Sequence, residues 1–403
     1  MSRMNYERDL ANKIKALCEQ FPVLVLTGAR QSGKTTLLRS LFPEYAYVSL
    51  DLPSKAFQAE NNPEEFLLLN KPPLLIDEVQ YAPKLFRHIK SIVDNDRHKM
   101  GQFLLTGSQK FVLMKEVADS LAGRCALLEL ETLSYQEISS GIRYEASISN
   151  MINLIVRGQY PELWRLPSID ETDFYSAYLA TYLERDLRQL LNVTSLRDFE
   201  RFIRILASRS GNILNKSDVA KEVGVSVKTI GEWVSVLDAS NIITLLEPYY
   251  GNMSKRMVKS PKVYFNDTGL LSYLLGVRKE SYLLSPFVGQ LWETFVFSEL
   301  RKLRYLSTSR PSIFFYRDQR ALEVDFLIDF GGQIRLAECK WKENPESRDL
   351  KGLTSVDAQI RNSSTLKPVN EHFLICNVPN SYRISDSMVS AINPLDIKRV
   401  LSL

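Results

Sequence analysis

VLVLTGARQSGKTTLLRSLF, from Val23 to Phe42, is the stretch that decides the fold of the first part of this chain. Its opening residues are apolar and predict a buried strand, and the residues from Lys34 onward predict a helix. Between strand and helix, Gly28 to Thr35 fits the pattern G-x-x-x-x-G-K-[ST] in the context that this phosphate-binding loop requires. The sequence therefore predicts a nucleotide-binding sheet.

Each residue type in this loop has a mechanical role. Glycines let backbone amides curl around phosphates, and the helix N-terminus offers oriented N–H groups. Lys34 reaches the outer phosphates, and the hydroxyl of Thr35 can bind Mg²⁺. The predicted nucleotide-binding residues are Gly28, Ala29, Arg30, Gln31, Ser32, Gly33, Lys34, Thr35 and Thr36.

Two further apolar runs end in polar residues. PPLLIDEVQ predicts a strand ending in Asp77, which can hold Mg²⁺, and Glu78, which can polarise the attacking water. QFLLTGSQ predicts a strand ending in Thr106 and Ser108. Ser108 could sense the terminal phosphate or orient water, and capping of a helix is an equal alternative. The alternative for Asp77 and Glu78 is an ordinary pair of acids at a strand end.

Strands and helices alternate over this part of the chain. This order predicts a parallel sheet with helices on both faces and with nucleotide at the carboxyl ends of the strands. Strands are expected near residues 23–27, 46–51, 73–77, 102–106 and 125–131.

The runs LTGARQSGKTTL, LLIDEVQ and LLTGSQ resemble the P-loop ATPases of the AAA+ type, in particular the small prokaryotic AAA_14 family. The resemblance implies ATP and Mg²⁺ as cofactors and is compatible with a homo-oligomer. SLAGR, ending in Arg124, also matches, which implies that Arg124 contacts the terminal phosphate in its own subunit or in a neighbour. A surface arginine at a helix end is the alternative.

Composition sets broad limits. With 403 residues, 45% hydrophobic and 24% charged, the chain is expected to fold as a globular protein of two or three domains. A net charge of +4 is compatible with nucleic acid but does not indicate it. The four cysteines lack CxxC spacing, and no apolar run approaches a membrane span. We expect a cytoplasmic protein with free thiols and no membrane partner.

The middle of the chain contains a helix-turn-helix pattern in NKSDVAKEVGVSVKTIGEWVSVLDASNIITLLEPYY, with Gly224 at the turn. A basic loop and the strand KVYFND then outline the wing of a winged helix. Such a module implies double-stranded DNA as a partner, and protein docking is the alternative. Residues expected to face the major groove are Ser226, Lys228, Thr229 and Glu232, and those expected near phosphates are Lys255, Arg256 and Lys259.

EVDFLIDFGGQIRLAECKW, from Glu323 to Trp341, predicts a hairpin that turns at two glycines. In this register Asp325 lies opposite Glu338, and Glu323 lies opposite Lys340. All four are expected on one face. The other face is expected to be filled by Val324, Phe326, Ile328 and Phe330.

Opposed carboxylates repel, so a cation between Asp325 and Glu338 is expected, with Mg²⁺ or Mn²⁺ preferred over zinc by oxygen ligands. Asp325, Glu338 and Lys340 resemble the PD-(D/E)xK nuclease motif, although Val324 replaces its proline. The resemblance implies a further acid, Glu293, in GQLWETFVFSEL. The alternative is a salt-bridged hairpin in which Lys340 pairs with Glu323 and one acid is protonated or exposed.

The expected fold is α/β: a P-loop NTPase sheet at 1–140, a helical and winged-helix segment at 141–275, and a restriction-endonuclease-like α/β domain at 276–403. The expected function is ATP hydrolysis coupled to a C-terminal region that binds or cleaves DNA. One alternative is a nucleotide-gated regulatory or defence switch whose C-terminal module binds partners or DNA without cutting. Another is an ATPase with a structural tail.

Overall fold

The computed structural model of the chain describes residues 6–108, 117–142, 147–182, 196–249, 259–307, 309–362, 366–384 and 387–402. The chain divides into two compact units. The first contains residues 1–133 with the short segments 160–162 and 239–241, and the second contains residues 134–159, 163–238 and 242–403. The segments predicted as a winged helix and a nuclease-like domain thus share one unit, and the division into three domains stays a prediction.

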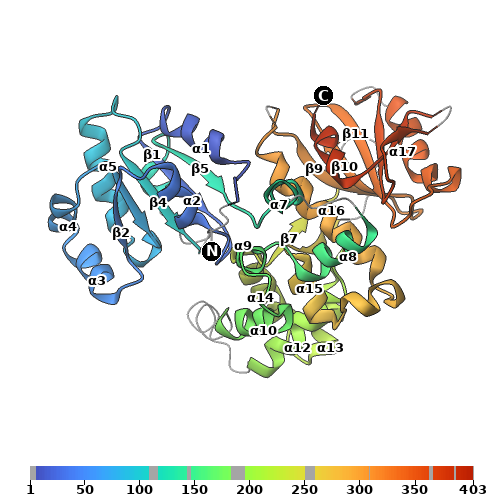
Figure 1. The fold of residues 1–403 in the computed structure, drawn as a ribbon, viewed down its shortest axis with the longest axis horizontal. Coiled ribbons are helices and arrows are strands. Elements are labelled where there is room, and N and C mark those ends of the chain that lie inside the picture. The colour runs from blue at the N-terminus through green and yellow to red at the C-terminus, as the bar shows by residue number, and fades with distance from the viewer. Residues whose placement is uncertain are drawn as a thin grey trace. The chain divides into compact units, whose positions relative to one another are not determined.

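The first unit is built on a five-stranded sheet in the order β2-β3-β4-β1-β5 (Figure 1). Every pairing in it is parallel, which confirms the sequence prediction. The strands are β1 (Val23–Thr27), β2 (Ala46–Ser49), β3 (Leu74–Asp77), β4 (Phe103–Gly107) and β5 (Cys125–Glu129). The helices are α1 (Ala11–Cys18), α2 (Lys34–Leu41), α3 (Pro53–Asn61), α4 (Pro63–Leu69), η1 (Val79–Tyr81), α5 (Leu85–Asn95) and η2 (Val117–Leu121).

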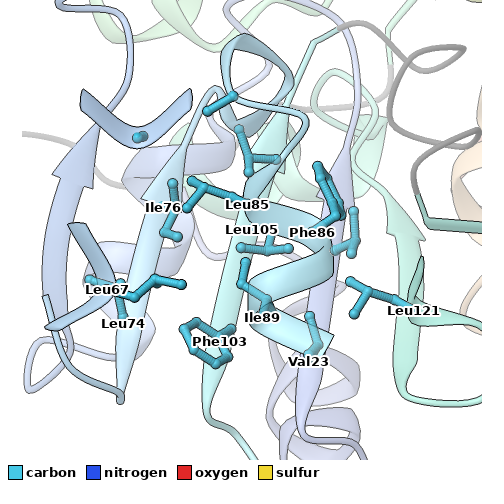
Figure 2. Close-up of a cluster of buried hydrophobic side chains, with 14 of the residues drawn as sticks. Val23, Leu67, Leu74, Ile76, Leu85, Phe86, Ile89, Phe103, Leu105 and Leu121 are labelled. Atoms are coloured by element: carbon cyan, nitrogen blue, oxygen red, sulfur yellow. The ribbon is translucent and has the colours of Figure 1, made fainter. Parts of the chain in front are cut away.

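One hydrophobic core of this unit lies between the sheet and α5 (Figure 2). The helix buries Leu85, Phe86, Ile89 and Val93, which share one face, against apolar side chains of β1, β3 and β4. Every residue of β1 is buried, because helices cover both faces of the sheet. This explains why the strand reads as a continuous apolar run.

The second unit begins with a helical region and a small antiparallel sheet in the order β6-β8-β7. The helices are α7 (Tyr135–Ile142), α8 (Ile148–Arg157), α9 (Pro161–Arg165), α10 (Glu171–Tyr182), α12 (Leu196–Ala207), α13 (Lys216–Val223), α14 (Val227–Ala239), α15 (Thr268–Leu275) and η4 (Lys279–Leu284). The strands are β6 (Asn212–Ile213), β7 (Ile243–Leu246) and β8 (Lys262–Phe265).

The turn between α13 and α14 forms where the sequence predicts it. Gly224 ends α13 with a φ of 89°, and Asn215 caps the start of that helix by accepting hydrogen bonds from the backbone of Ser217 and Asp218. Ile230 and Trp233 of α14 are buried. The segment joining β7 to β8 includes the predicted phosphate contacts Lys255 and Arg256, which lie outside the described residues.

The C-terminal part of the second unit is a mixed seven-stranded sheet in the order β14-β15-β13-β11-β10-β9, with β12 paired to β11. The strands are β9 (Ser312–Arg317), β10 (Glu323–Asp329), β11 (Gln333–Cys339), β12 (Lys367–Pro368), β13 (His372–Ile375), β14 (Tyr382–Arg383) and β15 (Val389–Ile392). The helices are α16 (Val288–Arg304), η5 (Ser347–Leu350), α17 (Lys351–Arg361) and η6 (Pro394–Leu401).

The hairpin of β10 and β11 has the predicted register. Phe326 pairs with Ala337, and the glycines at the turn, Gly331 and Gly332, have φ values of 78° and 98°. Positive φ at both central residues is the geometry of a two-residue type I′ turn, which only glycine and few other residues adopt readily. The turn therefore sets the register of the two strands.

The predicted alternation along β10 is wrong at Val324, which does not share a face with Phe326. The pairing with β9 shifts between Val324 and Leu327, so these two side chains share the apolar cluster on the α17 side. Phe326 instead stacks on Phe297 of α16, on the opposite face. A bulge of this kind places an extra residue in one strand and reverses the alternation beyond it.

Candidate nucleotide site and acidic cluster

Lys34 lies at the first turn of α2, where the phosphate-binding loop of residues 28–35 meets the helix. Its Nζ donates hydrogen bonds to the carbonyl oxygens of Gly28 and Ala29, each at 2.9 Å. The ammonium group thus folds back over its own loop and is buried. Burial lowers the pKa of Lys34 to about 8, although the nearby charges of Glu78 and Asp77 oppose this shift.

Asp77 receives hydroxyl hydrogen bonds on both carboxylate oxygens. Thr35 Oγ1 donates to Oδ1 at 2.8 Å, and Thr106 Oγ1 donates to the same oxygen. Tyr47, at the edge strand β2, donates to Oδ2 at 3.2 Å. The fold therefore brings Thr35 and Asp77 together, as expected for a pair that binds Mg²⁺. The sequence did not indicate Tyr47, because strand order alone brings β2 beside β3.

Glu78 follows Asp77 with a φ of 55°, in the left-handed region that side chains other than glycine rarely adopt. Its Oε2 accepts hydrogen bonds from Ser108 Oγ, at 3.2 Å, and from Gln80 Nε2. Ser108 is thus in contact with Glu78, and its predicted role at the terminal phosphate stays a prediction. Gln80 was overlooked, although it lies in the same DEVQ motif.

Two contacts fix the phosphate-binding loop to the end of β5. The buried guanidinium of Arg8 donates to the carbonyl oxygens of Ser32, at 2.9 Å, and Glu131, at 2.8 Å. Gly28 has a φ of 146°, and a Cβ added there would overlap the carbonyl oxygen of Leu130. Gly28 is therefore required by the close approach of the neighbouring chain. No sequence pattern singled out Arg8.

Arg124 lies at the amino-terminal ends of the strands, whereas this site lies at their carboxyl ends. It precedes Cys125, which pairs with Val23 at the start of β1, whereas the loop follows the other end of that strand. The two ends of β1 are separated by five strand residues, a distance of about 16 Å. Arg124 donates instead to both carboxylate oxygens of Asp94, at 2.6 and 3.0 Å. Its predicted contact with the phosphate of its own subunit is therefore wrong.

The two acids of the C-terminal hairpin meet where its ladder of backbone hydrogen bonds stops. Beyond the Phe326–Ala337 pair, the backbone N–H of Asp325 donates to Glu338 Oε2 at 3.3 Å. The backbone N–H of Cys339 donates to Asp325 Oδ2 at 2.8 Å. Each carboxylate therefore satisfies a backbone donor of the opposite strand.

The alternative of a hairpin bridged by an ion pair between Lys340 and Glu323 does not form, because each of the two side chains pairs elsewhere. Lys340 Nζ lies 2.9 Å from Glu338 Oε1, on its own strand. Glu323 pairs with Arg317 at 3.1 Å and with Lys262 at 2.7 Å. The paired register of the hairpin ends at Phe326 and Ala337, before Glu323 and Lys340 would meet.

Lys262 is the residue of the C-terminal site that the sequence interpretation missed. From the start of β8, its buried Nζ contacts Glu323, Glu293 Oε1 at 3.0 Å and Asp325 Oδ1 at 3.9 Å. Glu293 on α16 thus joins the hairpin acids, as expected, and also accepts a hydrogen bond from Tyr264. We call Lys262, Glu293, Glu323, Asp325, Glu338 and Lys340 the acidic cluster.

Burial and mutual repulsion dominate the electrostatics of this cluster. Burial raises the pKa of Asp325 well above its usual range, and Glu293 and Glu338 raise it further. Burial also raises the pKa of the Glu338 carboxyl. Burial alone would lower the pKa of Lys262, but the charges of Glu293, Asp325 and Glu323 outweigh burial and raise it.

Within the described part of the chain, no three His, Cys, Asp or Glu residues are grouped so that they could hold a metal ion. The predicted metal ligands Asp325 and Glu338 are adjacent, but the group lacks a third such ligand in the required arrangement. The described helices also include none that is long and apolar enough to cross a membrane.

The exposed start of α14 carries the residues predicted to face DNA. Lys228 lies 3.9 Å from Glu232, one turn along the helix. Ser226 Oγ accepts a hydrogen bond from the backbone of Thr229 at 3.0 Å, which caps the helix. Lys259 lies at the start of the described segment before β8 and is exposed. The lysines are therefore accessible, and the serine has a structural role as well.

Three family models match successive parts of the chain. An AAA domain covers residues 20–139, a domain of unknown function (DUF8612) covers 148–281, and a second one (DUF4143) covers 288–395. The AAA match confirms that the first unit is a P-loop ATPase domain.

Similar proteins have been described without an assigned function. The uncharacterized protein Rv2008c of Mycobacterium tuberculosis is 31% identical over 378 residues, covering 91% of this chain and 81% of that protein. The uncharacterized protein MJ1544 of Methanocaldococcus jannaschii is 23% identical, covering 84% and 77%. Among solved structures, the Walker-type ATPase PABY2304 of Pyrococcus abyssi is 14% identical, with a TM-score of 0.48, covering 67% of this chain and 96% of that one. The chain therefore belongs to the family of the mycobacterial protein Rv2008c, with an AAA domain followed by the DUF8612 and DUF4143 domains.

Proposed function

We propose that the chain binds ATP with Mg²⁺ at the phosphate-binding loop and hydrolyses it. The observation that carries this proposal is the convergence of Thr35, Asp77 and Glu78 beside Lys34. Thr35 and Asp77 share a 2.8 Å hydrogen bond, so their oxygens are already close enough to bind one ion. Bound Mg²⁺ would neutralise charge on the outer phosphates.

The residues of the chain divide the remaining work between them. Lys34 would exchange its two carbonyl acceptors for phosphate oxygens, which are stronger partners for an ammonium group. Glu78 would accept a proton from a water molecule. The oxygen of that water would attack the terminal phosphorus as the bond from phosphorus to ADP breaks. Ser108 and Gln80, which both donate to Glu78 Oε2, would hold the carboxylate in position.

Replacing Glu78 tests this assignment. Glu78→Gln keeps the size of the side chain but cannot accept the proton, so turnover should fall by about 10²–10⁴-fold. ATP affinity should be retained, because Lys34 and Thr35 are unchanged. Phosphate release and binding of a fluorescent ATP analogue would be measured together. Glu65→Gln, at an exposed acid of α4, is the matched control and should keep full turnover, and unchanged turnover in Glu78→Gln would contradict the proposal.

The helix-turn-helix supports DNA binding as a second proposal. Two helices joined at Gly224 and followed by an antiparallel strand pair leave the first turn of α14 exposed, with Lys228 at its surface. We propose that this surface binds double-stranded DNA and that nucleotide state changes its affinity.

Charge reversal separates DNA binding from protein docking. Lys228→Glu combined with Lys259→Glu should weaken duplex binding. The slope of log affinity against log salt concentration should become shallower by about 0.9 for each lost phosphate contact. Lys221→Glu, on the exposed side of α13, is the control. Fluorescence anisotropy would measure the duplex affinity of the unmodified chain, the double variant and the control, each with ATP, with ADP and without nucleotide. Equal duplex affinity in the double variant and the control would favour docking.

For the C-terminal region we favour binding without cleavage over a nuclease. In a nuclease, Asp325 and Glu338 would bind the metal, and Lys340 would stabilise a phosphoryl oxygen. The ammonium of Lys262 among the same carboxylates supports the alternative in which the C-terminal module binds without cutting.

A further inference from the structure

The acidic cluster has its own cation. The side chain of Lys262 is only 3% exposed and lies within 4 Å of Glu323, Glu293 and Asp325. Water screens the Lys262 ammonium little at this depth, so its charge depends on the neighbouring carboxylates for compensation. The lysine supplies the positive charge that the repulsion between the carboxylates requires.

The carboxylate oxygens are directed at protein donors. Asp325 Oδ2 and Glu338 Oε2 accept backbone N–H groups, and Glu338 Oε1 accepts from Lys340. Glu293 Oε1 accepts from both Tyr264 and Lys262. A Mg²⁺ ion needs several oxygen lone pairs at about 2.1 Å in near-octahedral geometry. Part of the acceptor capacity of these oxygens is therefore already used by donors of the protein, and the ammonium of Lys262, 3.9 Å from Asp325 Oδ1, would repel a divalent ion there.

The position of Lys262 is fixed by its strand. Its backbone pairs with Leu246 of β7 and Ile213 of β6, so the side chain starts from the middle strand of the small sheet. Its Nζ also lies 5.5 Å from the centre of the Phe315 ring on β9, an additional favourable contact for a cation. The ammonium is therefore held among its acceptors from several sides.

We propose that Lys262 is the resident cation of the acidic cluster, in place of a divalent metal, and that it joins β8 to α16 and β10. The residues do not fit the metal that the nuclease resemblance implies. The cluster then stabilises the second unit, and metal-dependent cleavage is not among its activities. This inference does not rest on ATP hydrolysis by the first unit.

Counting bound metal is the first test. The full chain would carry Asp77→Asn, which removes the carboxylate that would bind metal in the first unit, and would be free of nucleotide. Free Mn²⁺ would be measured by its electron paramagnetic resonance signal. We expect no tightly bound ion, and no change when Asp325→Asn is added. One Mn²⁺ per chain that is lost with Asp325→Asn would overturn the proposal.

Melting in EDTA is the second test. Lys262→Met leaves three carboxylates without their cation, and the melting temperature of the second unit should fall on the order of 10 °C. Lys340→Met is the matched control, because Lys340 is 38% exposed and contacts only Glu338 within the cluster, so its effect should be much smaller. Equal melting temperatures for the two variants would contradict the proposal. If Lys262→Met yields no folded protein, the Mn²⁺ count decides alone, because it is made with Lys262 in place.

Discussion

Among single residues, Lys34 has a charge that depends strongly on its surroundings. Burial lowers its pKa to about 8 in the nucleotide-free protein, against an ordinary value of 10.5. Between these two values the unfolded chain binds more protons than the folded one. The contribution of Lys34 to stability therefore rises with pH across this window, and below it the buried charge is destabilising.

The same shift predicts how ATP affinity depends on pH. Phosphate groups favour the charged form of Lys34, so above about pH 8 binding must be accompanied by proton uptake. Affinity should be constant just below this pH and then fall by up to about tenfold per pH unit above it. Titrations with a fluorescent ATP analogue would measure this. Lys34→Arg, which does not titrate in this range, is the control, and an equal slope in that variant would exclude Lys34 as the cause.

The residues predicted from sequence are those that lie within one continuous motif. Lys34 and Thr35 belong to one loop and Asp77 and Glu78 to one strand end, so chemistry and spacing could be interpreted together. Lys262 reaches the hairpin acids only because β8 packs beside β10, and no local pattern contains that information. The sequence suggested that a cation was needed but could not identify a lysine from another strand as that cation.

For secondary-structure elements, the hairpin of β10 and β11 shows which features are local. Its register follows from the turn at Gly331 and Gly332, which the sequence displays. The bulge between Val324 and Leu327 arises from the pairing with β9, and the sequence of β10 alone does not indicate it. The prediction of which face of the sheet each side chain of β10 occupies was therefore correct near the turn and wrong beyond the bulge.

The glycines of the helix-turn-helix give a paired prediction. Gly224 has positive φ at the end of α13, and no atom of the described residues crowds the position of an added Cβ. Gly224→Ala should therefore cost about 1 kcal/mol of unfolding free energy through backbone strain alone. Gly231→Ala, inside α14 and equally uncrowded, should gain up to about 1 kcal/mol from helix propensity. Urea unfolding compares them, and changes of the same sign would contradict this explanation.

For the whole molecule, the division into two units predicts how it melts. Calorimetry should resolve two transitions, because each unit has its own internal contacts. ATP with Mg²⁺ at about 100 times its dissociation constant stabilises the unit that binds it by about 2.7 kcal/mol. The transition of the first unit should rise by several degrees, and the other should not move. A single transition, or equal shifts of both, would show that the units unfold together.

Gly28 has a practical consequence for anyone designing inactive mutants. Its missing side chain makes room for the carbonyl of Leu130, which follows β5. An alanine there would force the loop or the backbone at Leu130 to move, so the variant would change the local structure as well as the binding of ATP. A negative assay result from it would say nothing about phosphate recognition, and Glu78→Gln is the substitution that leaves the scaffold intact.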